Sequence, residues 1–93
     1  PVWRGGDQGE DVLLASCYRS CFALVRQHGI RTVAFPAIST GAYGFPIERA
    51  ARIAVSEVRA GLEQNGSIER VSLVCFGRTA LETHQKVVAA LIA

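Results

Sequence analysis

The chain has 93 residues, of which 49% are hydrophobic, and a formal net charge of +2. This length fits one small domain with a genuine core, so residues 1–93 are expected to form a single domain. Acids and bases are interspersed and no apolar run approaches the roughly 20 residues of a membrane-spanning helix, so neither direct nucleic-acid binding nor a membrane partner is expected.

The first part of the chain predicts a strand remnant, a turn and a helix. Residues 1–3 are strand-like, with Trp3 as a core or edge residue, and a glycine-rich turn follows. Residues 10–28 have apolar side chains at helical spacing, and acids at Glu10 and Asp11 suit the positive dipole end of a helix. The predicted packing positions of this helix are Leu14, Cys17, Tyr18, Cys21, Phe22 and Val25.

Two buried strands and a second helix are predicted next. Residues 30–38 and 71–76 are near-continuous apolar runs, which are typical of parallel strands covered on both faces. Pro36 cannot donate to a ladder, so the first strand should break or become an edge there. A helix is expected from residue 47 to about residue 64, and Gly61 is a point where it could end early. Its predicted buried stripe comprises Ile47, Ala50, Ala51, Ala54, Val58 and Leu62.

A last helix is predicted to begin at Thr79, a suitable N-cap, with Glu82 three residues later in a capping-box pattern. Its apolar side carries Leu81, Val88 and Leu91. His84 lies near that side and is predicted to be a partly buried structural histidine. The element order is therefore (β)αβαβα, which predicts an α/β fold with a mainly parallel sheet and right-handed crossovers.

The cysteines, Cys17, Cys21 and Cys75, are odd in number and lack the spacing of a disulfide framework. This usage argues for a reducing compartment, and a cytoplasmic location is expected. His28 and His84 do not complete any known metal-ligand spacing with them. The three cysteines are therefore predicted to be small buried hydrophobes, with no metal site and no cofactor.

The run FPAISTGAYGFP, residues 35–46, is a small-residue loop between a strand and a helix, where parallel α/β proteins hold anionic ligands. The hydroxyls of Ser39 and Thr40 can donate to phosphate oxygens, and Gly41 lets the backbone approach closely. Pro46 suits a first helical position. The run is neither a Walker loop nor a GxGxxG motif, and an ordinary turn-forming connection remains an open alternative.

Phe76 ends the second apolar run, just before Gly77. If the two strands are neighbours, Phe76 lies beside the candidate phosphate loop, since parallel strands open their following loops at the same edge. Phe76 could then stack on a nucleobase, or it could be a core residue at a strand end. The residues alone leave both interpretations open.

The run at residues 35–46 resembles the second ligand loop of macro domains, which are three-layer α/β/α folds that recognise ADP-ribose. Pro1-Val2-Trp3, the segment LLASCY at residues 13–18 and the helix start at residues 48–53 are also similar to the MacroD-type branch, which includes bacterial O-acetyl-ADP-ribose deacetylases. The resemblance implies that backbone N–H groups from Ser39, Thr40, Gly41, Ala42 and Tyr43 hold the diphosphate. It also implies that Tyr43 packs against the distal ribose and that Phe76 stacks on adenine.

The chain resembles only the C-terminal part of such a domain, which is about twice as long, so an N-terminally truncated macro domain is expected. The segments that carry the adenine-reading acid, the Asn-Ala-Ala-Asn motif and the catalytic aspartate have no match here. Asp7 and Asp11 lie before or within the first helix, and nothing in the sequence makes either a substitute. The catalytic residues are therefore unknown.

Two functions are compatible with this reading, besides that of an inactive fragment. In the first, the parent protein hydrolyses O-acetyl-ADP-ribose or esters of ADP-ribose on acidic side chains, which makes ADP-ribosylated protein a candidate partner. In the second, the chain is a non-catalytic ADP-ribose-binding module. Because removing flanking strands leaves ladder groups unpaired and an apolar face uncovered, self-association of the chain is also predicted.

Overall fold

The computed structural model describes residues 1–38 and 44–92. Its elements are α1 (Glu10–Gln27), β1 (Thr32–Pro36), α2 (Ile47–Gln64), β2 (Arg70–Val74) and α3 (Arg78–Ile92). β1 and β2 are parallel neighbours, in register from Thr32↔Arg70 to Pro36↔Val74. The predicted α/β order is confirmed, except that residues 1–3 form no strand. None of the helices in the described ranges is long and apolar enough to cross a membrane.

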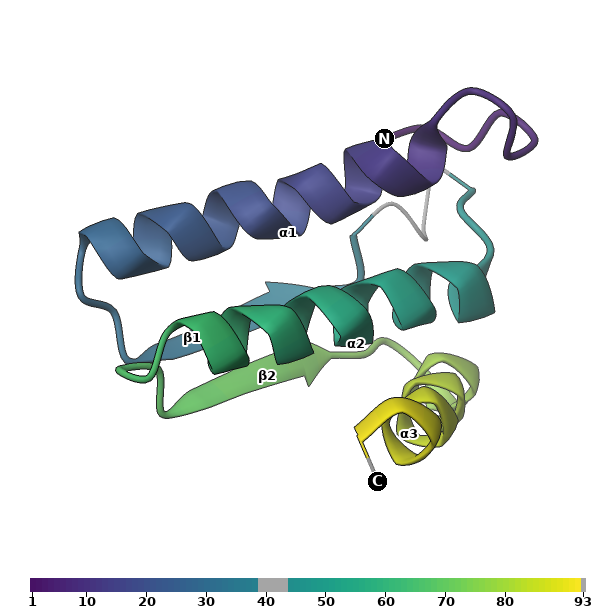
Figure 1. The fold of residues 1–93 in the computed structure, drawn as a ribbon. Helices are drawn as coiled ribbons and strands as arrows, with labels where there is room; N and C mark the ends of the chain where they lie inside the picture. The colour runs from purple at the N-terminus through teal and green to yellow at the C-terminus, as the bar shows by residue number, and fades with distance from the viewer. Residues whose placement is uncertain (39–43, 93) are drawn as a thin grey trace.

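The described helices cover one face of the sheet, with α2 in contact with both α1 and α3 (Figure 1). Burial alternates along both strands: Val33, Phe35, Val71 and Leu73 face the helices and pack against the core, whereas their neighbours are exposed. The prediction that both strand faces are buried is therefore wrong for this chain. An apolar run cannot distinguish a strand covered on two faces from one covered on a single face.

The larger core lies between α1, α2 and β1. Leu14, Tyr18, Phe22 and Val25 project from α1 at helical spacing, as predicted, and the rings of Tyr18 and Phe22 lie 5.1 and 5.5 Å from that of Phe35. Cys21 and Cys75 are half-buried, but Cys17 is exposed, so its predicted burial is wrong. Cys17 lies on α1 between the buried stripe and solvent, where no second layer covers it.

Gly61 of α2 lies directly against the Phe22 ring of α1. A Cβ at this position would lie 2.7 Å from Cδ1 of the Phe22 ring, closer than real Cβ contacts allow. The helix continues past it to Gln64, so Gly61 does not end the helix early. It makes room for the aromatic ring instead.

α3 packs on α2 through a smaller core of Ala51, Val55 and Val87. The helix begins at Arg78, one residue before the predicted N-cap, and the N–H of Leu81 donates to the Gly77 carbonyl at 3.2 Å. His84 is buried, as predicted, and its Nδ1–H donates to the Ala80 carbonyl at 2.8 Å.

The apolar side predicted for α3 is only partly buried. Leu81 and Val88 are 48% and 40% exposed, because α3 contacts α2 without closing over β2. They line a groove of about 500 Å³ between α2, β2 and α3, which Leu62 also borders.

Candidate ligand site at the carboxyl edge of the sheet

The carboxyl ends of β1 and β2 lie side by side. Pro36 pairs with Val74, so Ala37 and Cys75 leave the sheet at the same edge. The helix that follows β1 also begins at this edge, where the Ala50 N–H donates to the Pro46 carbonyl at 2.9 Å (Figure 1). As predicted, the chain leaves both strands at the same edge of the sheet.

Five of the six predicted ligand residues, Ser39, Thr40, Gly41, Ala42 and Tyr43, lie outside the described residues, and their roles stay predictions. Phe76 is described. Its side chain is 85% exposed, between the end of β2 and the turn at Gly77. Phe76 is therefore not a core residue of this chain, and its flat face is open to a stacking partner.

Tyr18 is a buried residue of α1 near the end of β1. The tyrosine is 2% exposed, and its ring centroid lies 5.1 Å from that of Phe35. Burial, together with the nearby Cys17 and Cys21 thiol groups, raises the pKa of Tyr18 to about 12, although the hydrogen bond from Ile38 acts in the opposite direction. The phenol is therefore neutral at physiological pH.

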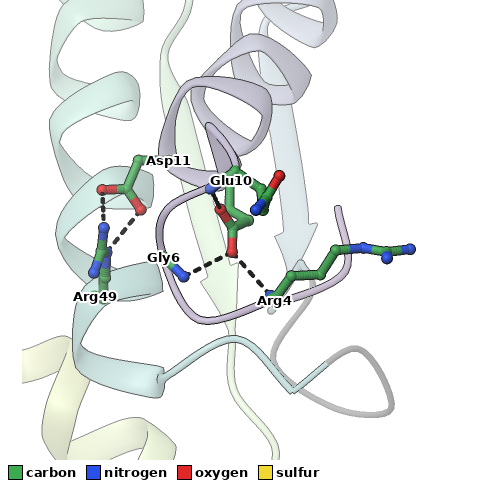
Figure 2. Close-up of polar contacts among 6 residues, drawn as sticks. Arg4, Gly6, Glu10, Asp11 and Arg49 are labelled. Carbon is green, nitrogen blue, oxygen red and sulfur yellow. Dashed lines mark hydrogen bonds and ion pairs between the residues drawn. The ribbon is translucent and has the colours of Figure 1, made fainter.

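Phe45, which follows residues 39–43 in the sequence, packs against Trp3. Phe45 is 2% exposed, and its ring centroid lies 4.9 Å from that of Trp3. The Arg49 guanidinium lies over the Trp3 ring at 4.9 Å, within cation–π range. Arg49 also makes a two-bonded ion pair with Asp11, with both N–O distances 2.8 Å (Figure 2).

The carboxylate of Glu10 organises the N-terminal segment that carries Trp3. It accepts backbone N–H bonds from Arg4 and Gly6, both at 2.8 Å (Figure 2). It also accepts one from Gln8 at 2.6 Å. Burial acts to raise the pKa of Glu10, but these N–H groups and its own N–H together lower that pKa to about 2. Hydrogen bonds to this charged carboxylate therefore hold residues 4–9 in place.

The sequence did not predict the contacts that Tyr18, Trp3 and Glu10 make with other described residues. Tyr18 was predicted to pack, and it does, but helical periodicity cannot show what its hydroxyl contacts. Glu10 was assigned to the helix dipole because its position at the helix start gave the only local signal. The positive φ angles of Gly5, Gly6 and Gly9 allow the tight loop around its carboxylate.

Comparison with known proteins identifies the family to which this chain belongs. The sequence model of the macro domain family matches residues 1–54. A macro domain-containing protein of Methanosarcina mazei is 53% identical over 92 residues, which cover 99% of this chain and 49% of that protein. O-acetyl-ADP-ribose deacetylase 1 of Pantoea vagans is 54% identical over 76 residues, 82% of this chain and 44% of the relative.

A solved structure agrees with the sequence matches. A mutant macrodomain of Oceanobacillus iheyensis with ADPR superposes with a TM-score of 0.91 at 35% identity, over 99% of this chain and 49% of the other. The chain therefore belongs to the macro domain family. It spans about half the length of the curated relatives that it matches.

Proposed function

We propose that this chain binds ADP-ribose at the shared carboxyl edge of β1 and β2. The observation that carries the proposal is the exposed Phe76 ring at the end of β2, on the same edge from which β1 leads into residues 39–43. Membership of the macro domain family, and the ADPR in the related O. iheyensis structure, support the choice of ligand.

In this proposal residues 39–43 hold the diphosphate and Phe76 stacks on adenine. Backbone N–H groups of Ser39, Thr40, Gly41, Ala42 and Tyr43 would donate to the phosphate oxygens. The first turn of α2 has unpaired N–H groups and the positive end of the helix dipole, which favours an anion at this edge. Tyr43 would pack against the distal ribose.

We assign ester hydrolysis to a protein of the relatives' full length that contains this chain. The name of the P. vagans relative supports O-acetyl-ADP-ribose as substrate, and esters of ADP-ribose on proteins have the same chemistry. The chain would contribute by positioning the diphosphate and ribose. Its free cysteines are consistent with the proposed cytoplasmic location.

The chain by itself would act as a non-catalytic binding module. Two carboxylates at the start of α1 are already engaged: Glu10 accepts three backbone hydrogen bonds from its neighbours, and Asp11 is paired with Arg49. A general base must be able to reach and accept a substrate or water proton. Neither carboxylate is placed for that task.

Calorimetric titration of ADP-ribose into the chain tests the binding, with Gly41→Glu as the site variant and Gly66→Glu as the matched control. Both changes add one acid in place of glycine, and a Cβ at Gly66, in the turn before β2, meets no atom within 4 Å. We expect saturable binding to the wild type and to Gly66→Glu, and none to Gly41→Glu. Equal affinity of all three would refute the assignment of the site, and the absence of binding to the folded wild type would refute the function.

A further inference from the structure

The turn between α2 and β2 carries the one asparagine of the chain, Asn65, followed directly by Gly66 (Figure 1). We propose that Asn65 is a site of spontaneous deamidation, in which the Gly66 backbone nitrogen attacks the side-chain amide of Asn65 and releases ammonia. The only co-reactant is water. This chemistry is independent of the proposed ADP-ribose site.

The Asn65 side chain is folded over the turn, and its carbonyl group is polarised. The Ser67 hydroxyl donates to Asn65 Oδ1 at 2.7 Å, which holds the amide group beside the backbone of the residues that follow it. A hydrogen bond to a carbonyl oxygen favours the negative charge that develops there during nucleophilic attack. Ser67 therefore activates Cγ of Asn65 as an electrophile.

The nitrogen that would leave has no partner. Nδ2 of Asn65 is buried and, among residues 1–38 and 44–92, makes no hydrogen bond. A buried amide N–H without an acceptor costs free energy, so rotation or loss of this group breaks no hydrogen bond and relieves that cost. The amide of Asn65 is therefore less stable than one whose N–H groups are satisfied.

Gly66 leaves its own nitrogen free to attack. The residue is exposed, and a Cβ at its position would meet no atom within 4 Å. In the part of the chain that the structure describes, no backbone carbonyl accepts a hydrogen bond from the Gly66 N–H. Attack requires rotation about the Asn65 Cα–C bond, which breaks the 3.2 Å hydrogen bond from the Ile68 N–H to the Asn65 carbonyl. A glycine in an open turn permits this rotation at little further cost.

The reaction forms a cyclic imide and then opens it. The Gly66 nitrogen loses its proton to solvent base and bonds to Asn65 Cγ. The bond from Cγ to Nδ2 breaks, and Nδ2 takes up a proton and leaves as ammonia. Water then opens the succinimide at either carbonyl to give aspartate or isoaspartate. The net change is the addition of one water and the loss of one ammonia.

Isoaspartate would lengthen the main chain in the turn that leads into β2. Ile68, which follows closely, is buried in the larger core, and the Glu69 N–H donates to the Arg31 carbonyl at 2.7 Å. An extra backbone methylene just before these residues displaces both contacts. The modification should therefore lower the stability of the fold. It lies at the amino end of β2, away from the carboxyl edge of the sheet (Figure 1).

The test is incubation of the purified chain at mildly alkaline pH, followed by mass spectrometry. We expect a mass increase of about one dalton, the difference between an amide and a carboxyl group, which fragmentation locates at residue 65. An isoaspartyl-specific methyltransferase should label part of the product. Gln8 is the internal control: it also precedes a glycine, but its longer side chain would have to close a larger ring, so it should stay intact.

Two variants and a peptide assign the parts of the turn. Ser67→Ala should slow deamidation of the folded chain about two- to tenfold, the equivalent of one hydrogen bond. Gly66→Ala should slow it further, because a Cβ crowds the attacking nitrogen, while the open space around Gly66 keeps the fold intact. A short peptide spanning the turn, with and without Ser67→Ala, shows the reaction without the fold.

The slowing by Ser67→Ala should be larger in the folded chain than in the peptide. Equal slowing in both would overturn the activation by the Ser67 hydrogen bond. If Asn65 stays intact in the folded chain over the time in which the peptide deamidates, the fold protects the residue and the proposal is overturned.

Discussion

Replacement of Phe76 by alanine should separate ligand binding from stability. The ring is 85% exposed, so most of the 150–250 Å² or so that an aromatic side chain can bury is still available to a nucleobase. Truncation of so exposed a side chain should change the free energy of unfolding by no more than about 0.5 kcal/mol. Loss of one base-stacking contact should reduce the binding free energy by about 1–3 kcal/mol, or roughly five- to 150-fold in Kd.

Calorimetric titration of ADP-ribose measures this loss, and urea unfolding measures stability. Phe76→Leu distinguishes stacking from simple apolar contact, because leucine keeps an apolar side chain without a flat ring; it should recover only part of the affinity. Leu24→Ala is the matched control, since Leu24 is 54% exposed near the far end of α1. Unchanged affinity in Phe76→Ala would refute the adenine contact. A large loss of stability would show that the Phe76 ring is buried, and not exposed, in the folded chain.

Three further predictions concern the fold. Gly61→Ala should destabilise the chain by about 1 kcal/mol in urea unfolding, because crowding of the Phe22 ring outweighs the gain in helix propensity of about 1 kcal/mol. Gly66→Ala is the control and should be nearly neutral, and a stabilised Gly61→Ala variant would contradict the close helix contact. The Glu10 carboxylate, with its pKa lowered from 4.5 to about 2, should stabilise the fold fully above pH 4.5 and lose this effect as the pH falls through 2. Thermal melts of Glu10→Gln should therefore lie below those of the wild type at pH 7 and converge with them toward pH 2, and parallel curves would exclude the role. Within residues 1–38 and 44–92 the two-stranded sheet has an open face and no further strand on either edge, which should make the chain self-associate in sedimentation experiments. A well-folded monomer at high concentration would count against this.

The elements were predictable to the extent that local pattern determines them. The second helix was expected from residue 47 to about residue 64 and runs over Ile47–Gln64, because its amphipathic pattern is strong and Pro46 precedes it. Both strands are shorter than expected: an apolar run continues beyond the residues that find a ladder partner. α3 begins at Arg78, one residue before the predicted N-cap Thr79, and the Gly77 carbonyl accepts a hydrogen bond from the Leu81 N–H.

The supports of the candidate site could not be predicted, because they join residues far apart in the chain. The Trp3 ring meets Phe45 and Arg49 only after α1 and α2 have packed, and nothing near Trp3 in the sequence specifies those partners. The exposure of Phe76 similarly depends on how α3 leaves the sheet. The position of the candidate site at one edge was predictable, since the order of parallel strands and their loops determines it.

The most direct test of the account is a map of ADP-ribose on the isotope-labelled chain by nuclear magnetic resonance. Chemical-shift changes on titration should concentrate at described residues that follow the two strands, such as Ile38, Gly44, Phe76 and Gly77. Changes confined to the groove between α2, β2 and α3, around Leu81 and Val88, would place the ligand elsewhere and contradict the account. A folded chain whose spectrum does not change at saturating ADP-ribose would contradict it equally.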